Sequence, residues 1–218
     1  MKYKSIILII FLISLFSLSQ VHATTNDLIL LGKIIYLDAG HGGIDAGATT
    51  GKNLEKDLNL EITQKLATKL GEKGAIIYLT RDGDYDLADN QYSRKRSDLS
   101  NRARLINESN CDLYLSIHLN SSTDPSWRGI QVFYNKINHK NKEIATIMTD
   151  AFKTMTSTIK EVKEDNNYYM YKQITVPGIL IEAGFISNSS DLYLLKQNKY
   201  QNKLAQIITK GVENYFQK

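Results

Sequence analysis

The chain has 218 residues, and its 27 lysine and arginine residues only slightly exceed its 23 aspartate and glutamate residues, which gives a formal charge of +4. This small charge provides no argument for nucleic acid as a partner, because nucleic-acid-binding domains carry dense basic patches. The single cysteine, Cys111, excludes an internal disulfide. We expect it to be a small buried residue before the apolar run 113–119, and not a nucleophile.

Residues 1–23 have the layout of a secretory signal peptide. Lys2 and Lys4 form a basic start, residues 5–18 are almost wholly apolar, and small residues at the end of the segment predict cleavage after Ala23. An uncleaved membrane anchor is the alternative, although a membrane span needs roughly 20 apolar residues. We therefore predict export across the cytoplasmic membrane, with the formal charge falling to +2 when the two lysines are removed.

The predicted elements begin after a polar leader at residues 24–32. A β-branched and aromatic run at residues 33–37 predicts a first strand. Apolar residues recur every four positions within residues 55–72, which predicts an amphipathic helix. Residues 75–80 predict a second, buried strand. Residues 81–98 are polar and predict a surface loop.

The second half of the chain continues the alternation of helices and strands. Its predicted elements are, in chain order, a short helix from Leu99 to about Asn110, strands at residues 113–118 and 129–134, a helix over residues 144–155, a strand beginning at Ile179 and a carboxy-terminal helix containing Leu204 to Tyr215. Such alternation predicts an α/β fold. We expect residues 33–218 to form a single domain with a twisted, mostly parallel sheet of about five or six strands, flanked by helices on both faces.

Two histidines and two glutamates lie at element ends in this scheme. His41 follows the first strand, His118 and Glu182 end two later strands, and Glu55 opens the first helix. Sites in open α/β sheets gather at the carboxyl ends of the strands. Two imidazoles and one carboxylate form a catalytic type of zinc ligand set, because a fourth position stays open for water. We therefore predict that His41, Glu55 and His118 bind one zinc ion, with Glu182 as the proton acceptor.

Each ligand has a simpler structural explanation. His41 lies among glycines that favour a turn, but the segment lacks the GxGxxG spacing and the Walker lysine of phosphate-binding loops. Glu55 could be a surface charge at a helix start, and Asp57 is its nearest competitor as a ligand. His118 could be a hydrogen-bonded core residue. For Glu182 a purely structural role is disfavoured, because a carboxylate in an apolar strand needs a cation or hydrogen bonds.

Other residues could contribute to the site or to the surface. Asn120 points to the same side of an extended chain as His118, and we predict that it orients substrate or a ligand. We expect the basic triplet at residues 94–96 to be a solvated loop and His139 to be exposed. Trp127 could form a wall on which a sugar stacks.

Four separated motifs resemble a known enzyme family. They are residues 34–43 (IIYLDAGHGG), 54–57 (LEKD), 115–120 (LSIHLN) and 180–188 (LIEAGFISN). These motifs are similar to those of the zinc-dependent N-acetylmuramoyl-L-alanine amidases of bacterial cell walls. More narrowly, the chain resembles the germination-specific branch, which prepares spore cortex peptidoglycan for muramic-δ-lactam formation. The tract at residues 92–96 and the Trp127 neighbourhood support that branch.

The resemblance implies hydrolysis of the amide between the lactyl group of muramic acid and L-alanine of the stem peptide. It also implies that His41, Glu55 and His118 are zinc ligands and that Glu182 is the catalytic glutamate. Peptidoglycan would be the substrate, in the cell wall or spore cortex, and an accessory protein is compatible with the bare catalytic domain. Two alternatives stay open: a peptidoglycan-binding module of the same fold without turnover, and a zinc carboxypeptidase acting within the stem peptide.

Overall fold

The computed structural model describes residues 28–89 and 91–218. The predicted signal peptide, residues 1–23, therefore lies outside the described residues. Within the described ranges, no helix has the length and apolar character needed to cross a membrane. The end of the predicted leader packs against the domain, because Leu30 is fully buried and its amide donates to the Lys73 carbonyl.

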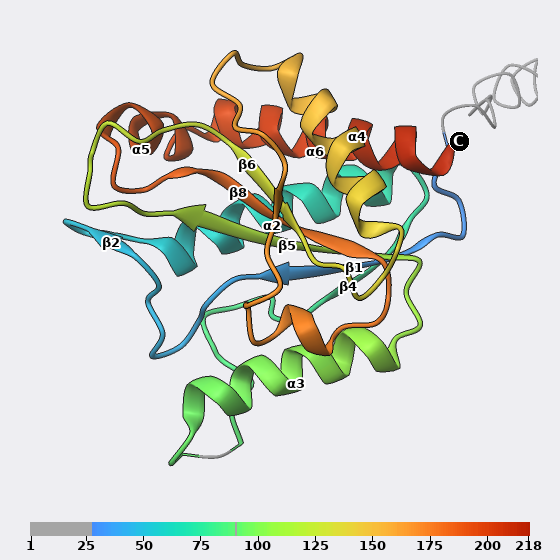
Figure 1. Cartoon of the computed structure of the whole chain (residues 1–218), viewed down its shortest axis with the longest axis horizontal. Coiled ribbons are helices and arrows are strands. Elements are labelled where there is room, and N and C mark those ends of the chain that lie inside the picture. Colours follow the sequence, from blue (N-terminus) through green and yellow to red (C-terminus); the bar gives the residue numbers. More distant parts are fainter. Residues whose placement is uncertain (1–27, 90) are drawn as a thin grey trace, which may run out of the picture.

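A six-stranded sheet forms the centre of the molecule (Figure 1). Its strands are, in chain order, β1 (Ile34–Ala39), β4 (Ile76–Leu79), β5 (Leu113–Asn120), β6 (Gln131–Tyr134), β7 (Lys163–Glu164) and β8 (Gly178–Phe185). They lie in the order β4-β1-β5-β8-β6-β7, and the first four are mutually parallel. β6 pairs antiparallel with β8, and β7 pairs parallel with β6, so these two strands run opposite to the other four. The predicted single α/β domain with a mostly parallel sheet is confirmed.

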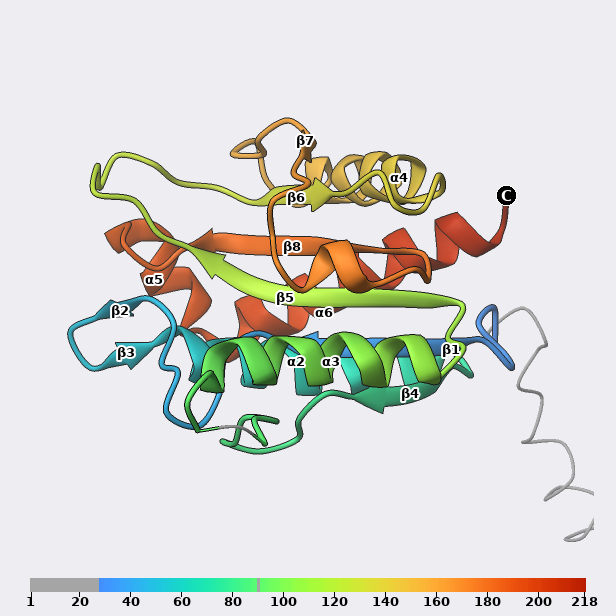
Figure 2. The same ribbon diagram turned by 60° about the horizontal axis from the view of Figure 1, so that its bottom comes forward.

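Helices cover both faces of the sheet, as predicted. One face carries α2 (Glu55–Glu72), α4 (Asn141–Lys153) and α6 (Asn198–Phe216). The other face carries α3 (Arg94–Glu108), which Figure 2 shows in front of the sheet with α2 and α6 behind it. Smaller elements are the hairpin of β2 (Thr49–Thr50) and β3 (Asn53–Leu54), the 3-10 turn η2 (Tyr171–Gln173) and α5 (Ser189–Leu195).

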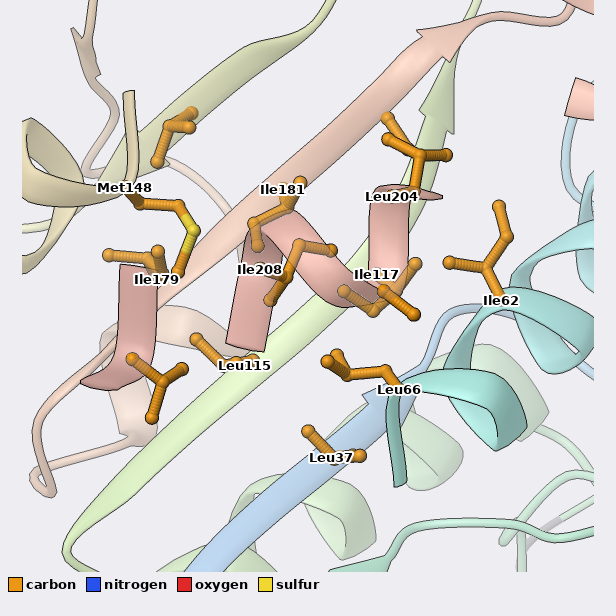
Figure 3. Packing of buried hydrophobic residues seen from close by; sticks show 14 of the residues in the cluster. Leu37, Ile62, Leu66, Leu115, Ile117, Met148, Ile179, Ile181, Leu204 and Ile208 are labelled. Atoms are coloured by element: carbon orange, nitrogen blue, oxygen red, sulfur yellow. The ribbon is translucent and has the colours of Figure 1, made fainter. Parts of the chain in front are cut away.

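The larger apolar cluster lies between the sheet and α2, α4 and α6. Leu115, Ile117 and Ile181 project from the central strands toward Leu66 and Ile208 on the helices (Figure 3). Strands buried on both faces by helices read as continuous apolar runs, which is why β5 and β8 were recognisable from the sequence.

Alternation along the strands decides which residues can form a site. On β5, Leu115 and Ile117 enter the larger cluster, so Ser116, His118 and Asn120 point to the face that α3 covers. On β8, Ile181 enters the larger cluster, so the adjacent Glu182 points to the opposite face, which α3 covers. The polar residues of both strands therefore share one face, near the strand ends.

Three sequence predictions were wrong. Residues 81–98 are not all loop, because α3 begins at Arg94, so the basic triplet at residues 94–96 is helical and not a solvated loop. Residues 75–80 contain a strand that is not buried, because β4 lies at the sheet edge and Ile76 and Tyr78 are half exposed. His118 and Glu182 do not end their strands. Pairing of Asn120 with Phe185 extends both strands beyond them.

The burial of Leu66 and the exposure of Ile76 predict different effects of alanine substitution at these two positions. Leu66 is fully buried, so Leu66→Ala should lower the free energy of unfolding by about 3 kcal/mol through lost burial and a residual cavity. Ile76 on the exposed edge provides the matched control, and Ile76→Ala should cost less than about 1 kcal/mol. Urea denaturation followed by circular dichroism measures both values, and equal losses would contradict this assignment of the core.

Candidate metal centre and active site

His41, Glu55 and His118 come together in space although they are far apart in the chain. Each offers one ligand atom, and these atoms lie within 4.8 Å of one another. The Nε2 atom of His41 is 3.2 Å from Oε2 of Glu55, and the Nδ1 atom of His118 is 3.1 Å from Oε1 of Glu55. The predicted convergence is confirmed. Asp57, the competitor of Glu55, is exposed and lies outside the cluster.

The Glu55 carboxylate is held by the backbone of two other segments. Its Oε2 accepts from the Ala48 amide at 2.8 Å, and its Oε1 accepts from the Leu119 amide at 3.0 Å. Burial of Glu55 opposes ionisation, but the hydrogen bonds of His118 and His41 outweigh it and lower the pKa of Glu55. The first residue of α2 is therefore a fixed anion between two imidazoles.

His41 occupies a backbone conformation that residues with side chains rarely adopt. Its φ angle is 61°, in the left-handed region. Its Nδ1 atom lies 3.0 Å from Oδ2 of Asp45, which orients the ring so that Nε2 faces Glu55. Burial of His41 works against protonation, but the contacts with Asp45 and Glu55 raise its pKa to about 9.

Glycines make room for the rings. A Cβ atom on Gly40 would lie 2.2 Å from the His118 ring, and one on Gly47 would lie 2.6 Å from Oε2 of Glu55. Both distances are too short for any side chain, so the close packing of the two imidazoles and the carboxylate requires glycine at these positions.

Two fully buried arginines hold the loop that presents His41. Arg102 donates to the carbonyl oxygens of Ala39 at 2.8 Å and of His41 at 2.6 Å. Arg81 donates to the carbonyls of Ala39 and Gly40, both at 2.9 Å, and to the carbonyl of Lys56 at 2.7 Å. Arg81 thereby joins the loop to the first turn of α2, next to Glu55.

A buried network anchors Arg102 from below the loop. Asp38 accepts from Arg102 at 2.8 Å, from Thr80 at 2.8 Å and from Ser116 at 2.5 Å. Tyr171 then donates to the Ser116 hydroxyl at 2.8 Å. Burial raises the pKa of Asp38, but the Arg102 guanidinium more than offsets this and holds it below its usual value. The network connects β1, β5, α3 and η2 next to the cluster of His41, Glu55 and His118.

Glu182 lies beside His118, its partner across β5 and β8. It is buried, and its Oε2 atom has no hydrogen-bond partner among the described residues. Burial raises the pKa of Glu182 to about 7, although the neighbouring His118 lowers it. A buried carboxylate oxygen without a protein partner is available to bond a water molecule, an ion or a substrate group.

A cavity of about 300 Å³ opens above these groups. His41, Glu55, His118 and Glu182 all line it, so the sequence-predicted site residues face one space. Asn120 also lines the cavity, as expected from its parity with His118, and its side-chain oxygen accepts from the Ser121 amide at 2.8 Å.

The rest of the cavity wall was not foreseen. Lys95 and Leu99 contribute from α3, Tyr168 and Tyr169 from the segment before η2, and Tyr171 from η2 itself. The sequence offered no signal for these tyrosines, because they lie in a stretch without periodicity. Asp45, by contrast, was detectable as an acid four residues after His41.

The remaining sequence predictions had mixed outcomes. Cys111 is buried and free, and His139 is exposed, both as expected. Trp127 is half exposed and packs at 6.4 Å between ring centroids against Phe185, outside the set of residues that line the cavity. Phe133 belongs to the smaller apolar cluster.

The donor set fits zinc. Ligand atoms around one tetrahedral zinc lie roughly 3.4 Å apart, given bonds of about 2.0–2.1 Å. Each imidazole lies near a different oxygen of Glu55, at 3.1 Å from Oε1 for His118 and at 3.2 Å from Oε2 for His41, and one ligand atom from each of the three residues lies within 4.8 Å of the other two. Glu55 and Asp45 also supply the negative charge and the ring orientation that such a centre needs.

Comparison with known proteins shows the family. The sequence profile of the N-acetylmuramoyl-L-alanine amidases, Amidase_3, matches residues 35–214. The chain belongs to the N-acetylmuramoyl-L-alanine amidase family. The resemblance inferred from the four motifs is thus confirmed, and the chain is an amidase with a His-Glu-His candidate metal site.

Individual relatives cover most of the amidase chain. The germination-specific N-acetylmuramoyl-L-alanine amidase of Bacillus subtilis is 44% identical over 192 residues, which is 86% of this chain and 81% of the relative. The CwlD amidase of Clostridioides difficile, solved in complex with the GerS lipoprotein, has a TM-score of 0.79 and 35% identity, over 85% of this chain and 98% of that one. The catalytic domain of CwlV from Bacillus (Paenibacillus) polymyxa has a TM-score of 0.75 and 28% identity, over 85% of this chain and 98% of that one.

The close approach at Gly40 predicts a selective loss of metal. Gly40→Ala should displace the His118 ring and reduce bound zinc at least about tenfold, since one ligand moves away. Gly71→Ala is the matched control, because Gly71 lies in α2 with open space around it and should retain zinc. Zinc content by mass spectrometry of the purified proteins, with circular dichroism for folding, measures the effect. Full zinc occupancy in Gly40→Ala would contradict the assigned geometry.

The buried network predicts a pH-dependent stability difference. Asp38→Asn leaves Arg102 without its main counter-charge and should lower the free energy of unfolding at pH 7 by about 3–5 kcal/mol. The pKa of Asp38 is lower in the folded state than in the unfolded chain, at about 3.9. The stabilisation is therefore fully present above about pH 4 and is lost as the pH falls through the folded-state pKa.

Urea titrations between pH 3 and pH 8 test this. The difference between the wild type and Asp38→Asn should be constant at neutral pH and shrink below about pH 4. Asp150→Asn on the exposed side of α4 is the control and should change stability by less than about 0.5 kcal/mol. A difference that grows on acidification is the opposite of the expected result.

Proposed function

We propose that this amidase is zinc-dependent and hydrolyses the amide between the lactyl group of muramic acid and L-alanine of the peptidoglycan stem peptide. The observation that carries the proposal is the position of the unpartnered Glu182 carboxylate beside the cluster of His41, Glu55 and His118 in one cavity. Peptidoglycan lies outside the cytoplasm, which agrees with the export predicted from residues 1–23.

His41, Glu55 and His118 would hold the zinc ion, which supplies a Lewis acid for the scissile carbonyl and makes water acidic enough to lose a proton near neutral pH. Glu182 accepts that proton as a general base, and the burial that raises its pKa to about 7 suits it to this role near neutral pH. Glu182 then delivers the proton to the departing alanine nitrogen, which must leave as an amine. Asn120 at the cavity wall hydrogen-bonds the substrate and limits its orientation.

We further propose that the enzyme acts on spore cortex peptidoglycan, as a step toward muramic-δ-lactam formation. The support is its similarity to a relative named as germination-specific, at 44% identity. The CwlD amidase was solved with a lipoprotein, and by analogy an accessory protein would assist this chain as well.

The two alternatives give different products. A binding module of this fold would retain muropeptides without releasing peptide, and a zinc carboxypeptidase would free one terminal amino acid. An amidase releases an intact peptide that begins with alanine. Mass spectrometry of defined muropeptides after incubation with the zinc-loaded protein separates all three functions.

The assigned proton acceptor predicts that Glu182→Gln keeps its zinc and its fold but loses amide cleavage by at least about 10³-fold. The reason is that an amide cannot accept the proton, while the three ligands are unchanged. Glu72→Gln on the exposed end of α2 is the control and should cleave at the wild-type rate. Zinc content and the rate of peptide release are measured for each protein with and without a chelator. Near-normal peptide release by Glu182→Gln would falsify the role of this residue.

A further inference from the structure

The first turn of α3 has an unusual charge pattern. It begins with Arg94, Lys95 and Arg96, and it contains no acidic residue. The preceding Ser93 makes no capping hydrogen bond through its side chain. Because the amino end of a helix carries partial positive charge, three cations there destabilise the helix unless other contacts compensate. Residues that break a local rule in this way call for an explanation elsewhere in the molecule.

Two of the three cations have structural partners. Arg94 forms a two-armed contact with the buried Asp86 carboxylate, with hydrogen bonds of 3.0 Å from both Nε and Nη2. Arg96 donates to the Tyr169 hydroxyl at 2.9 Å and lies over the Tyr169 ring, 4.9 Å from its centroid. Arg94 therefore fastens the helix start to the preceding loop, and Arg96 fastens it to the cavity wall.

Lys95 differs from its neighbours. Its side chain is 71% exposed, and its closest carboxylate, Asp45, is 3.7 Å away. Asp45 is already engaged at 3.0 Å by His41. Lys95 nevertheless lines the cavity, and it is the only lysine or arginine among the described residues that do so. Figure 2 shows α3 beginning at the end of the sheet where the arrowhead of β5 lies.

The chemistry of the substrate limits what such a cation can bind. The N-acetylated sugars of peptidoglycan are neutral, and the carboxyl group of muramic acid is consumed in the scissile amide. Any anionic group near the reacting bond therefore belongs to the stem peptide. The first such group is the α-carboxylate of the second residue, a glutamate linked through its side chain, within about 7 Å of extended chain beyond L-alanine.

We propose that Lys95 binds this carboxylate and makes the enzyme select stem peptides with a free acid over those in which it is amidated. This inference rests on the proposed amidase function. It implies that the stem peptide lies along the wall of the cavity that α3 forms. Lys95 is a specificity residue that contacts substrate without taking part in the proton transfers.

Steady-state kinetics with two muropeptides test the assignment. The substrates differ only in whether the α-carboxyl group of the second residue is free or amidated. Lys95→Met should raise KM about 5- to 10-fold for the acid, the size expected for loss of one charge-assisted hydrogen bond, and should change KM for the amide by less than about 2-fold. Lys95→Arg should keep the preference for the acid. Lys203→Met on the exposed side of α6 is the control and should match the wild type.

The possible outcomes separate this inference from the proposed function. Equal changes for both substrates in Lys95→Met, or no change for either, overturn the role of Lys95 while leaving the amidase intact. If the wild type cleaves neither substrate, the proposed function fails. Calorimetric binding of the L-alanyl-isoglutamate product and of its amide then decides the matter for Lys95: tighter binding of the acid that Lys95→Met abolishes supports the inference, and equal binding overturns it.

Discussion

Two buried arginine side chains donate hydrogen bonds to the carbonyl oxygens at the end of β1 and in the loop that follows. These hydrogen bonds hold the rest of the site in place. Arg81 and Arg102 approach the Ala39 carbonyl together and continue to the carbonyls of Gly40 and His41. A left-handed residue costs conformational energy, of order 1–3 kcal/mol, and persists only where its surroundings over-determine it. Four hydrogen bonds from the two arginines and a set of flanking glycines provide that constraint at His41. Without it, the loop has no physical reason to place an imidazole over Glu55.

Because of these arginines, the geometry of the site depends on several elements of the domain and not on one loop alone. Arg102 comes from α3, and Asp98 on the same helix accepts from its Nε atom. Arg81 follows β4, on the far side of β1 from β5. The helix that covers one face of the sheet therefore controls a ligand at the end of a strand. The helix on the opposite face supplies Glu55, so the three ligands reach one point from both sides of the sheet.

The sequence was sufficient to predict the fold class and the residues that converge at the candidate site, but it did not reveal the residues that hold them in place. His41, Glu55, His118 and Glu182 stood out because polar residues at the ends of apolar runs have few structural explanations. Arg81 could not be identified in this way, because an arginine after a strand in a polar stretch is typical of a surface loop. Its burial depends on carbonyl groups of segments about 25 and 40 residues away in the chain. Tertiary partners of that kind leave no local pattern.

The boundaries of α3 and β4 illustrate the same limit. Neighbouring lysine and arginine residues favour a loop, and only the contacts of Arg94 with Asp86 and of Arg96 with Tyr169 make a helix start there acceptable. In β4, an apolar run predicted burial, but a run of this composition is equally compatible with an edge position. Which strand lies at the edge is decided by the order of the sheet, and that order is a property of the whole chain.

The three candidate ligands are far apart in the chain and come together only in the folded domain. His118 is separated from His41 by the β2–β3 hairpin, the helices α2 and α3 and the strand β4, so the centre cannot assemble from a short peptide as it does in a zinc finger. Closing so long a segment is an entropic cost that apolar packing must offset first. A metal ion held by His41, Glu55 and His118 would therefore bind after the polypeptide has folded.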